Sequence, residues 1–356
     1  MLRLALVIAV SWNACSQVVA AGDLTSVRER AIRFLRLTQN PDGSWTERQQ
    51  VGVTGLVTMS LLESGVPASD PDVARSIAHL LAHQKPDGGF YAPNSLQRNY
   101  ETCITVMVLS AADVATYAPQ IQRAEAFLRE LQWDAGEGIE SSDPAWGGGG
   151  YGKHERPDLS NTQFLLEALT AAGVGADDPA MQRIRTFVSR TQNFESSGND
   201  TPFAAKINDG GFYYTPAAGG ESKAGLTPDG GLRSYGSMTY AGLKSLIYAG
   251  LSPDDPRVQA AQNWIRQHYT LTENPGMGAQ GLYYYFHTFG KTMATLGEDE
   301  FVDAAGVRHD WKAELSQQLT ARQRPNGSWV NPQDRWYEGD PNLVTAYSLL
   351  ALSFCD

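Results

Sequence analysis

Two hydrophobic patterns alternate along the chain and predict two kinds of helix. In the first, apolar residues recur every three or four positions, as at Val73, Ile77 and Leu80, while Arg and Gln occupy the opposite face. This spacing predicts outer helices with one solvent-exposed side. Segments of the second kind are apolar on nearly all sides, which predicts buried inner helices.

Capping signals mark where these helices begin and end. Asp-Pro pairs precede outer helices at 70–71, 178–179 and 255–256, and they fit an Asp N-cap followed by Pro at the first helical position. The inner segments align on one threonine each, at Thr54, Thr102, Thr162, Thr239, Thr288 and Thr345. The hydroxyl group of each threonine is expected to cap the start of its helix. A glycine near the end of most inner segments is the expected C-terminal cap.

A turn sequence repeats between the outer and the inner segments. Gln39–Trp45, Gln84–Phe90 and Gln323–Trp329 share Gln, Pro, Asp or Asn, Gly and a final aromatic residue, and weaker echoes occur at Asn208–Phe212 and Pro228–Leu232. Pro-Asp-Gly favours a tight turn because Pro fixes φ and Gly accepts a positive φ. The aromatic residue can then fold back against the helices.

Six outer and six inner segments predict an all-α fold, an α6/α6 toroid that is a closed ring of six helical hairpins. Hairpins of this kind stack as an open solenoid or close into a ring. Closure is favoured here because an open superhelix would leave the apolar inner helices facing water. We expect residues 22–356 to form this ring as a single domain.

Composition and the N-terminal segment bear on location. The 356 residues carry a formal net charge of −11 and no basic run, which argues against nucleic-acid binding and against an anionic membrane surface. Residues 1–21 combine Arg3, the apolar run Leu4–Val10 and small residues before Gly22, which predicts a signal peptide and export to the periplasm, cell surface or medium. A lipoprotein signal ending at Cys15 is the weaker alternative. No later segment is apolar for long enough to span a membrane.

Cys103 and Cys355 remain after the predicted cleavage. In the ring they would lie at opposite ends of inner helices, too far apart for a disulfide, so we expect free thiols. Their spacing gives no zinc-site signal.

The Gln-x-x-(Asp/Asn)-Gly-(Ser/Gly)-(Trp/Phe) runs resemble the QW repeats of squalene and oxidosqualene cyclases and the related repeats of protein prenyltransferase β-subunits. The resemblance covers almost the whole chain after the predicted signal peptide. It implies the toroid and a central pocket for an isoprenoid or another hydrophobic ligand.

The family's catalytic groups are incomplete in this sequence. Class II cyclases protonate an alkene or epoxide with the Asp of an Asp-x-Asp-Asp motif, which this sequence lacks. Prenyltransferases bind zinc through Asp-x-Cys and a later His. His287 stands where that His would be, but the preceding repeat offers Tyr235-Gly-Ser237. We therefore expect neither a metal nor another cofactor.

Polar residues gather where the inner helices should begin, at one rim of the ring. Aligned helix N-termini give this rim a positive field and unpaired N–H groups, suited to an anion. The candidate catalytic residues are Glu101, Asp158, His287 and Asp340. The candidate ligand-binding residues are Asn161, Tyr235, Tyr284, Tyr285 and Asn342. Each also has a purely structural interpretation, as a helix cap or a packing residue.

Three functions fit these observations. The pocket binds or transforms an isoprenoid or other hydrophobic molecule; or the protein is an exported carbohydrate-active toroid, such as a polysaccharide lyase using Asn161, His287 and Tyr285; or it is a non-catalytic binding scaffold. A small hydrophobic or anionic ligand is the expected partner, and the sequence identifies no protein partner.

Overall fold

The computed structural model describes residues 21–47, 50–152 and 155–356, without the side chains of residues 21–23. Apart from Ala21, the predicted signal peptide lies outside the described residues. The outer helices are α1 (Ala21–Thr38), α3 (Pro71–Ala82), α5 (Ala118–Leu131), α7 (Pro179–Arg190), α10 (Pro256–His268) and α12 (Trp311–Arg322). The inner helices are α2 (Gln50–Glu63), α4 (Arg98–Asp113), α6 (Leu159–Ala171), α9 (Gly236–Tyr248), α11 (Leu282–Leu296) and α13 (Pro341–Leu352).

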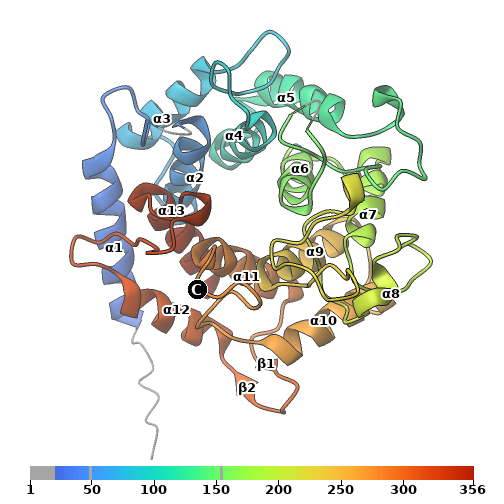
Figure 1. Cartoon of the computed structure of the whole chain (residues 1–356). Helices are drawn as coiled ribbons and strands as arrows, with labels where there is room; N and C mark the ends of the chain where they lie inside the picture. The colour runs from blue at the N-terminus through green and yellow to red at the C-terminus, as the bar shows by residue number, and fades with distance from the viewer. Residues whose placement is uncertain (1–20, 48–49, 153–154) are drawn as a thin grey trace, which may run out of the picture.

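The inner helices stand in a ring, with the outer helices around them (Figure 1). Each inner helix contacts the next one along the chain, and α13 contacts α2. The outer helix α1 packs against α13 and α12, so the first and last helices lie side by side. This arrangement confirms the predicted all-α toroid.

The connections contain only short elements. A two-stranded antiparallel hairpin pairs β1 (Phe301–Val302) with β2 (Arg308–His309). Single helical turns complete the described chain at α8 (Ala204–Ile207), η1 (Ala135–Glu137), η2 (Ala217–Gly219), η3 (Arg335–Tyr337) and η4 (Ser353–Cys355). None of the described helices is both long and apolar enough to cross a membrane.

The predicted Asp caps are confirmed. The side chains of Asp70, Asp178 and Asp255 each accept a hydrogen bond from a backbone N–H in the first turn of an outer helix. The glycine expected at the end of α9, Gly250, has a positive φ of 88°, which a residue with a side chain rarely adopts. Cys103 and Cys355 are free, as predicted.

Five of the six aligned threonines bind the turns; the expectation that the threonines cap helix starts was wrong, because each lies inside its helix. Five of them accept a hydrogen bond from a turn N–H, at 3.0–3.2 Å, in the pairs Trp45–Thr54, Phe90–Thr102, Gly149–Thr162, Phe212–Thr239 and Trp329–Thr345. Thr288 differs, since its hydroxyl donates to carbonyls of its own helix.

These hydrogen bonds also show which of the weaker sequence matches are true copies of the turn. Asn208–Phe212 is one, because the N–H of Phe212 donates to Thr239, one of the aligned threonines. Pro228–Leu232 is not; it lies in a loop closed by a bridge between Leu226 and Leu232. The copy at Gly149 has no aromatic residue at that position, so the sequence pattern did not reveal it.

Each turn glutamine joins two neighbouring repeats. The amide nitrogen of Gln39 donates to the carbonyl of Gly43 in its own turn and to that of Asp72 in the next outer helix. The glutamines at 84, 132, 192 and 323 make the same pair of bonds. The last of these, Gln323, reaches the carbonyl of Val27 in α1 and so helps to close the ring.

Gly327 allows the last turn to approach α1. Its φ is +90°, and a Cβ atom here would lie 2.3 Å from the carbonyl oxygen of Arg30. We predict that Gly327→Ala lowers the free energy of unfolding by about 3 kcal/mol, through both the left-handed backbone and the clash. Gly306→Ala is the matched control, since Gly306 has a φ of +81° and nothing within 4 Å. Urea denaturation measures both; equal losses would contradict the role of the close approach.

Candidate functional site

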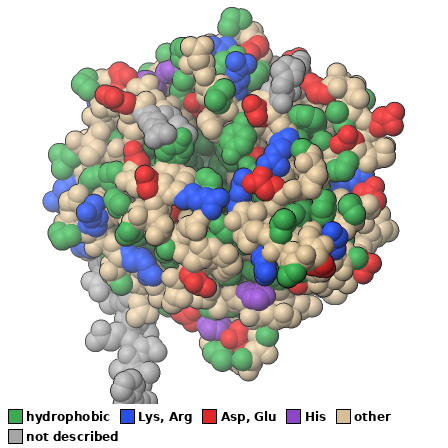
Figure 2. Space-filling model, in the orientation of Figure 1, with side chains coloured by type: hydrophobic (Ala, Val, Ile, Leu, Met, Phe, Trp, Pro, Cys, Tyr) green, Lys and Arg blue, Asp and Glu red, His purple; other side chains and the backbone are tan. Residues whose placement is uncertain are grey.

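A cavity of about 180 Å³ lies where the inner helices begin. Its aromatic wall consists of Tyr100, Tyr151, Phe164, Tyr214, Tyr235, Tyr284, Trp336, Tyr337 and Tyr347. Its other lining residues are Gly52, Val53, Leu56, Gln97, Glu101, Ile104, Ser160, Lys223, Ser237, Met238, Glu338 and Leu343. The face shown in Figure 2 is hollowed near its centre, with hydrophobic side chains inside the hollow and Lys and Arg side chains near its edge.

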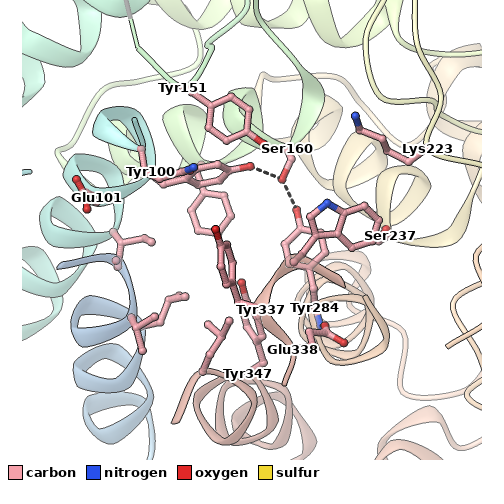
Figure 3. Close-up of a pocket in the computed structure, with 18 of the residues that line it drawn as sticks. Tyr100, Glu101, Tyr151, Ser160, Lys223, Ser237, Tyr284, Tyr337, Glu338 and Tyr347 are labelled. Carbon is pink, nitrogen blue, oxygen red and sulfur yellow. Dashed lines mark hydrogen bonds between the residues drawn. The ribbon is translucent and has the colours of Figure 1, made fainter. Parts of the chain in front are cut away.

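Three hydroxyl groups meet at one wall of the cavity (Figure 3). The Tyr100 hydroxyl, from α4, donates to Ser160 Oγ on α6 at 2.7 Å. Ser160 Oγ lies 3.0 Å from the Tyr284 hydroxyl, on α11, which also accepts from the amide nitrogen of Gln163. Burial raises the pKa of both tyrosines well above the usual value, so these hydroxyls stay neutral. We call Tyr100, Ser160 and Tyr284 the hydroxyl cluster.

Two carboxyl groups also line the cavity. Glu101, predicted from the sequence, is buried and accepts a bond from the N–H of Ala92 at 3.3 Å; burial raises its pKa. Glu338 was not predicted. Its carboxylate accepts from the N–H of Tyr284 at 2.8 Å, at the start of α11, and from the amide of Asn331 at 2.6 Å. Burial nevertheless raises the pKa of Glu338 to about 7.

Asp158 and Asn161 lie beside the cavity, outside its lining. Asp158 caps α6: its carboxylate accepts from the backbone N–H of Asn161 at 2.9 Å and from that side chain at 2.8 Å. The amide oxygen of Asn161 accepts in turn from Asn99 at 3.1 Å. Burial raises the pKa of Asp158 to about 6. Both residues therefore order the start of α6, behind Ser160.

The stretch Asp158-Leu159-Ser160-Asn161 carries a signal that the sequence analysis missed. It keeps the first Asp of the Asp-x-Asp-Asp pattern and has Ser and Asn at the last two positions. Ser160 is the member of this stretch that lines the cavity. A hydroxyl group thus stands where that pattern would place a carboxyl group.

The other candidates are distributed between the cavity wall and sites away from it. Tyr235 lines the cavity, as does Tyr284. Asp340 caps α13, accepting from the N–H of Asn342 at 2.8 Å, and the side chain of Asn342 accepts from Thr38 at 2.7 Å. Tyr285 points the other way and donates to the carbonyl of Thr270 at 2.7 Å. Neither Asp340, Asn342 nor Tyr285 lines the cavity.

His287 also lies outside the cavity lining. It stacks between Tyr347 and Phe354, at 5.8 and 6.4 Å between ring centres. Burial, together with the ammonium groups of Lys291 and Lys244, lowers its pKa to about 3. His287 is therefore a neutral packing residue at ordinary pH.

This neutral state predicts a pH effect. An unfolded His titrates near pH 6.5 and the folded one near pH 3, so protons bind the unfolded chain first and stability falls below pH 6.5. Between pH 7 and pH 5 this group should remove about 2 kcal/mol. His287→Phe should abolish that share of the pH dependence, as measured by urea denaturation at both pH values. Identical pH slopes in the two proteins would contradict the lowered pKa.

In the part of the chain that the structure describes, one cation, Lys223, lines the cavity. Its ammonium group lies 4.4 Å from the centre of the Tyr214 ring and is ion-paired with Glu221. Burial, and then the neighbouring Arg156, lower its pKa. Within the described ranges, no three His, Cys, Asp or Glu side chains come close enough together to hold a metal ion.

Comparisons with known proteins place this geometry in context. Residues 49–215 match the family model of the squalene-hopene cyclase C-terminal domain. Drimenyl diphosphate synthase of Streptomyces showdoensis is 29% identical over 150 residues, 41% of this chain. The match spans only 26% of that enzyme's length.

Solved structures share the fold over nearly the whole chain. The type II terpene cyclase MstE from Scytonema is 16% identical, with a TM-score of 0.57 over 94% of this chain and 98% of its own. The protein geranylgeranyltransferase-I of Candida albicans is 11% identical, with a TM-score of 0.55 over 92% and 90%. A possible GH105 family member from Salmonella enterica is 10% identical, with a TM-score of 0.55 over 98% of both. At these identities the likeness establishes the fold alone.

Proposed function

We propose that the chain belongs to the terpenoid cyclase and protein prenyltransferase superfamily and that its central cavity binds an isoprenoid or a similar hydrophobic molecule. The observation that carries the proposal is the cavity wall, in which aromatic and aliphatic side chains predominate. Burial of a flexible hydrocarbon against such a wall is driven by the removal of apolar surface from water.

The structural neighbours support this ligand class. MstE has been solved with geranylgeranyl dihydroxybenzoate as its substrate, and the Candida albicans transferase has been solved with GGPP. The cavity in this chain, at about 180 Å³, is small beside typical ligand pockets of roughly 300–1,000 Å³. A short isoprenoid of ten or so carbon atoms is therefore the first ligand class to test.

Blocking the cavity tests the proposal. Leu56 lines the cavity from α2, so Leu56→Trp should fill it and weaken the binding of a ten-carbon isoprenoid at least about tenfold, as measured by calorimetry. Leu62→Trp is the control, since Leu62 is half-buried on the same helix and does not line the cavity. Mass spectrometry of an organic extract would show whether a lipid co-purifies. Absence of isoprenoid binding by the wild-type protein would overturn the proposal.

We propose further that the N-terminal segment directs export, with cleavage before Gly22. The support is the sequence pattern of Arg3 followed by the apolar run Leu4–Val10. Cell fractionation of the full chain and of a chain lacking residues 2–21 tests this. An equal distribution of both forms would overturn it.

A further inference from the structure

We infer that the cavity recognises its ligand by an uncharged acceptor oxygen, bound by the hydroxyl cluster of Tyr100, Ser160 and Tyr284. The inference rests on the proposed function and specifies its substrate class: an oxygen-bearing isoprenoid, such as an alcohol, ketone or ether, in preference to a pure hydrocarbon. Three inner helices, α4, α6 and α11, bring these hydroxyls together at the cavity wall.

Counting protons shows that the cluster has a donor to spare. Three hydroxyl groups carry three hydrogens, and two hydrogen bonds join them. Tyr100 donates to Ser160. If Tyr284 also donates to Ser160, the serine hydrogen is left over; if Ser160 donates to Tyr284, the tyrosine hydrogen is left over. In both cases one hydrogen has no acceptor within the cluster.

Gln163 does not take up this hydrogen in the structure: its amide nitrogen donates to Tyr284, and its buried Oε1 has no hydrogen-bond partner. All three cluster residues line the cavity, so the remaining O–H group is available to a ligand there. An unpaired buried donor is costly, whereas a ligand oxygen would satisfy it. The cavity is thus complementary to a molecule that places an acceptor at this wall.

The surroundings favour an uncharged acceptor. The donors are neutral hydroxyls, and Phe164 and Ile104 line the same cavity with apolar surface. A carboxylate or phosphate at this wall would need a cation to offset its loss of hydration. Among the described residues, the cation that lines the cavity is Lys223, and it shares the Glu221 carboxylate with Arg156.

The identity of residue 160 supports the same conclusion. A carboxyl group at this position could give up its proton, whereas a serine hydroxyl donates a hydrogen bond and retains the proton. The cluster is therefore suited to hold an oxygen in place and not to protonate a double bond.

Matched ligands test the inference. Calorimetry should show that wild-type protein binds geraniol about five- to tenfold more tightly than myrcene, a hydrocarbon with the same number of carbon atoms. Ser160→Ala should reduce that ratio to about one, by weakening geraniol binding and leaving myrcene binding unchanged. Ser348→Ala should preserve the ratio, since Ser348 lies on α13 outside the cavity lining. Tyr284→Phe gives a second test if Ser160→Ala does not fold.

The outcomes separate the two proposals. Equal binding of geraniol and myrcene to wild-type protein would overturn the oxygen preference and leave isoprenoid binding intact. Tighter binding of geranic acid than of geraniol at pH 7.5 would overturn the preference for an uncharged oxygen. Failure to bind any of the three molecules would overturn the proposed function itself.

Discussion

Replacing Glu167 with glutamine should lower the free energy of unfolding by about 3–5 kcal/mol, because it removes the one carboxylate that serves two ammonium groups. Lys244 from α9 and Lys291 from α11 both form ion pairs with Glu167 on α6. Burial opposes ionisation of Glu167, but the two cations outweigh it and hold its pKa well below the usual range. Glutamine would leave both ammonium groups without their ion-pair partner. Urea denaturation at pH 7 measures the loss.

Combining Glu167→Gln with Lys244→Met provides the control. The double variant retains Lys291 alone, whose side chain is partly exposed, and should recover a large part of the loss. The lowered pKa of Glu167 also sets the direction of the pH dependence. The contribution of Glu167 to the free energy of unfolding is present above the unfolded-state pKa near 4.5 and disappears as the pH falls. A cost below about 1 kcal/mol at pH 7 would show that the ion pairs are not needed.

Trp329→Ala should destabilise the protein by about 3–5 kcal/mol. The indole is fully buried, and its N–H donates to the carbonyl of Leu319 at 2.8 Å. Trp329→Phe should cost much less, about 1–2 kcal/mol, because Phe90 and Phe212 fill the same place in other repeats. Thermal and urea unfolding of both variants measure the difference.

Trp336→Ala is the matched control, since Trp336 is 41% exposed and contributes little to the core. Its substitution should change the free energy of unfolding by less than about 1 kcal/mol. If Trp329→Phe were as costly as Trp329→Ala, the repeat positions would not be equivalent.

Much of the fold could be predicted from the sequence because the repeats are local signals. The helical periodicity, the Asp caps and the aligned threonine each occur within a single repeat. Together they indicate both the number of helices and the ring. The turn at Gly149 escaped detection because one residue without a side chain replaces the aromatic. The similar run at Pro228–Leu232 misled for the opposite reason: its letters match, but its hydrogen bond goes to Thr227 beside it and not to one of the aligned threonines of the inner helices.

The site was harder to predict because its residues come together across the ring. Glu101, Tyr235 and Tyr284 were found from their places near helix starts. Glu338 was not, because it lies in an irregular segment where Trp336 and Tyr337 have positive φ, and its role depends on contact with α11. His287 was selected by position along the chain, but the register of α11 turns it toward Tyr347 and Phe354.

Because α1 packs against α13, the ring does not depend on where the chain begins and ends. Arg28 pairs with Asp356 at 2.7 Å and donates to the carbonyl of Leu352, so the two ends of the ring already adhere without a peptide bond. A circularly permuted chain, with a linker across this junction and new termini in the exposed loop near Glu140, should retain the same architecture. Such a protein would offer attachment points on a different side of the molecule.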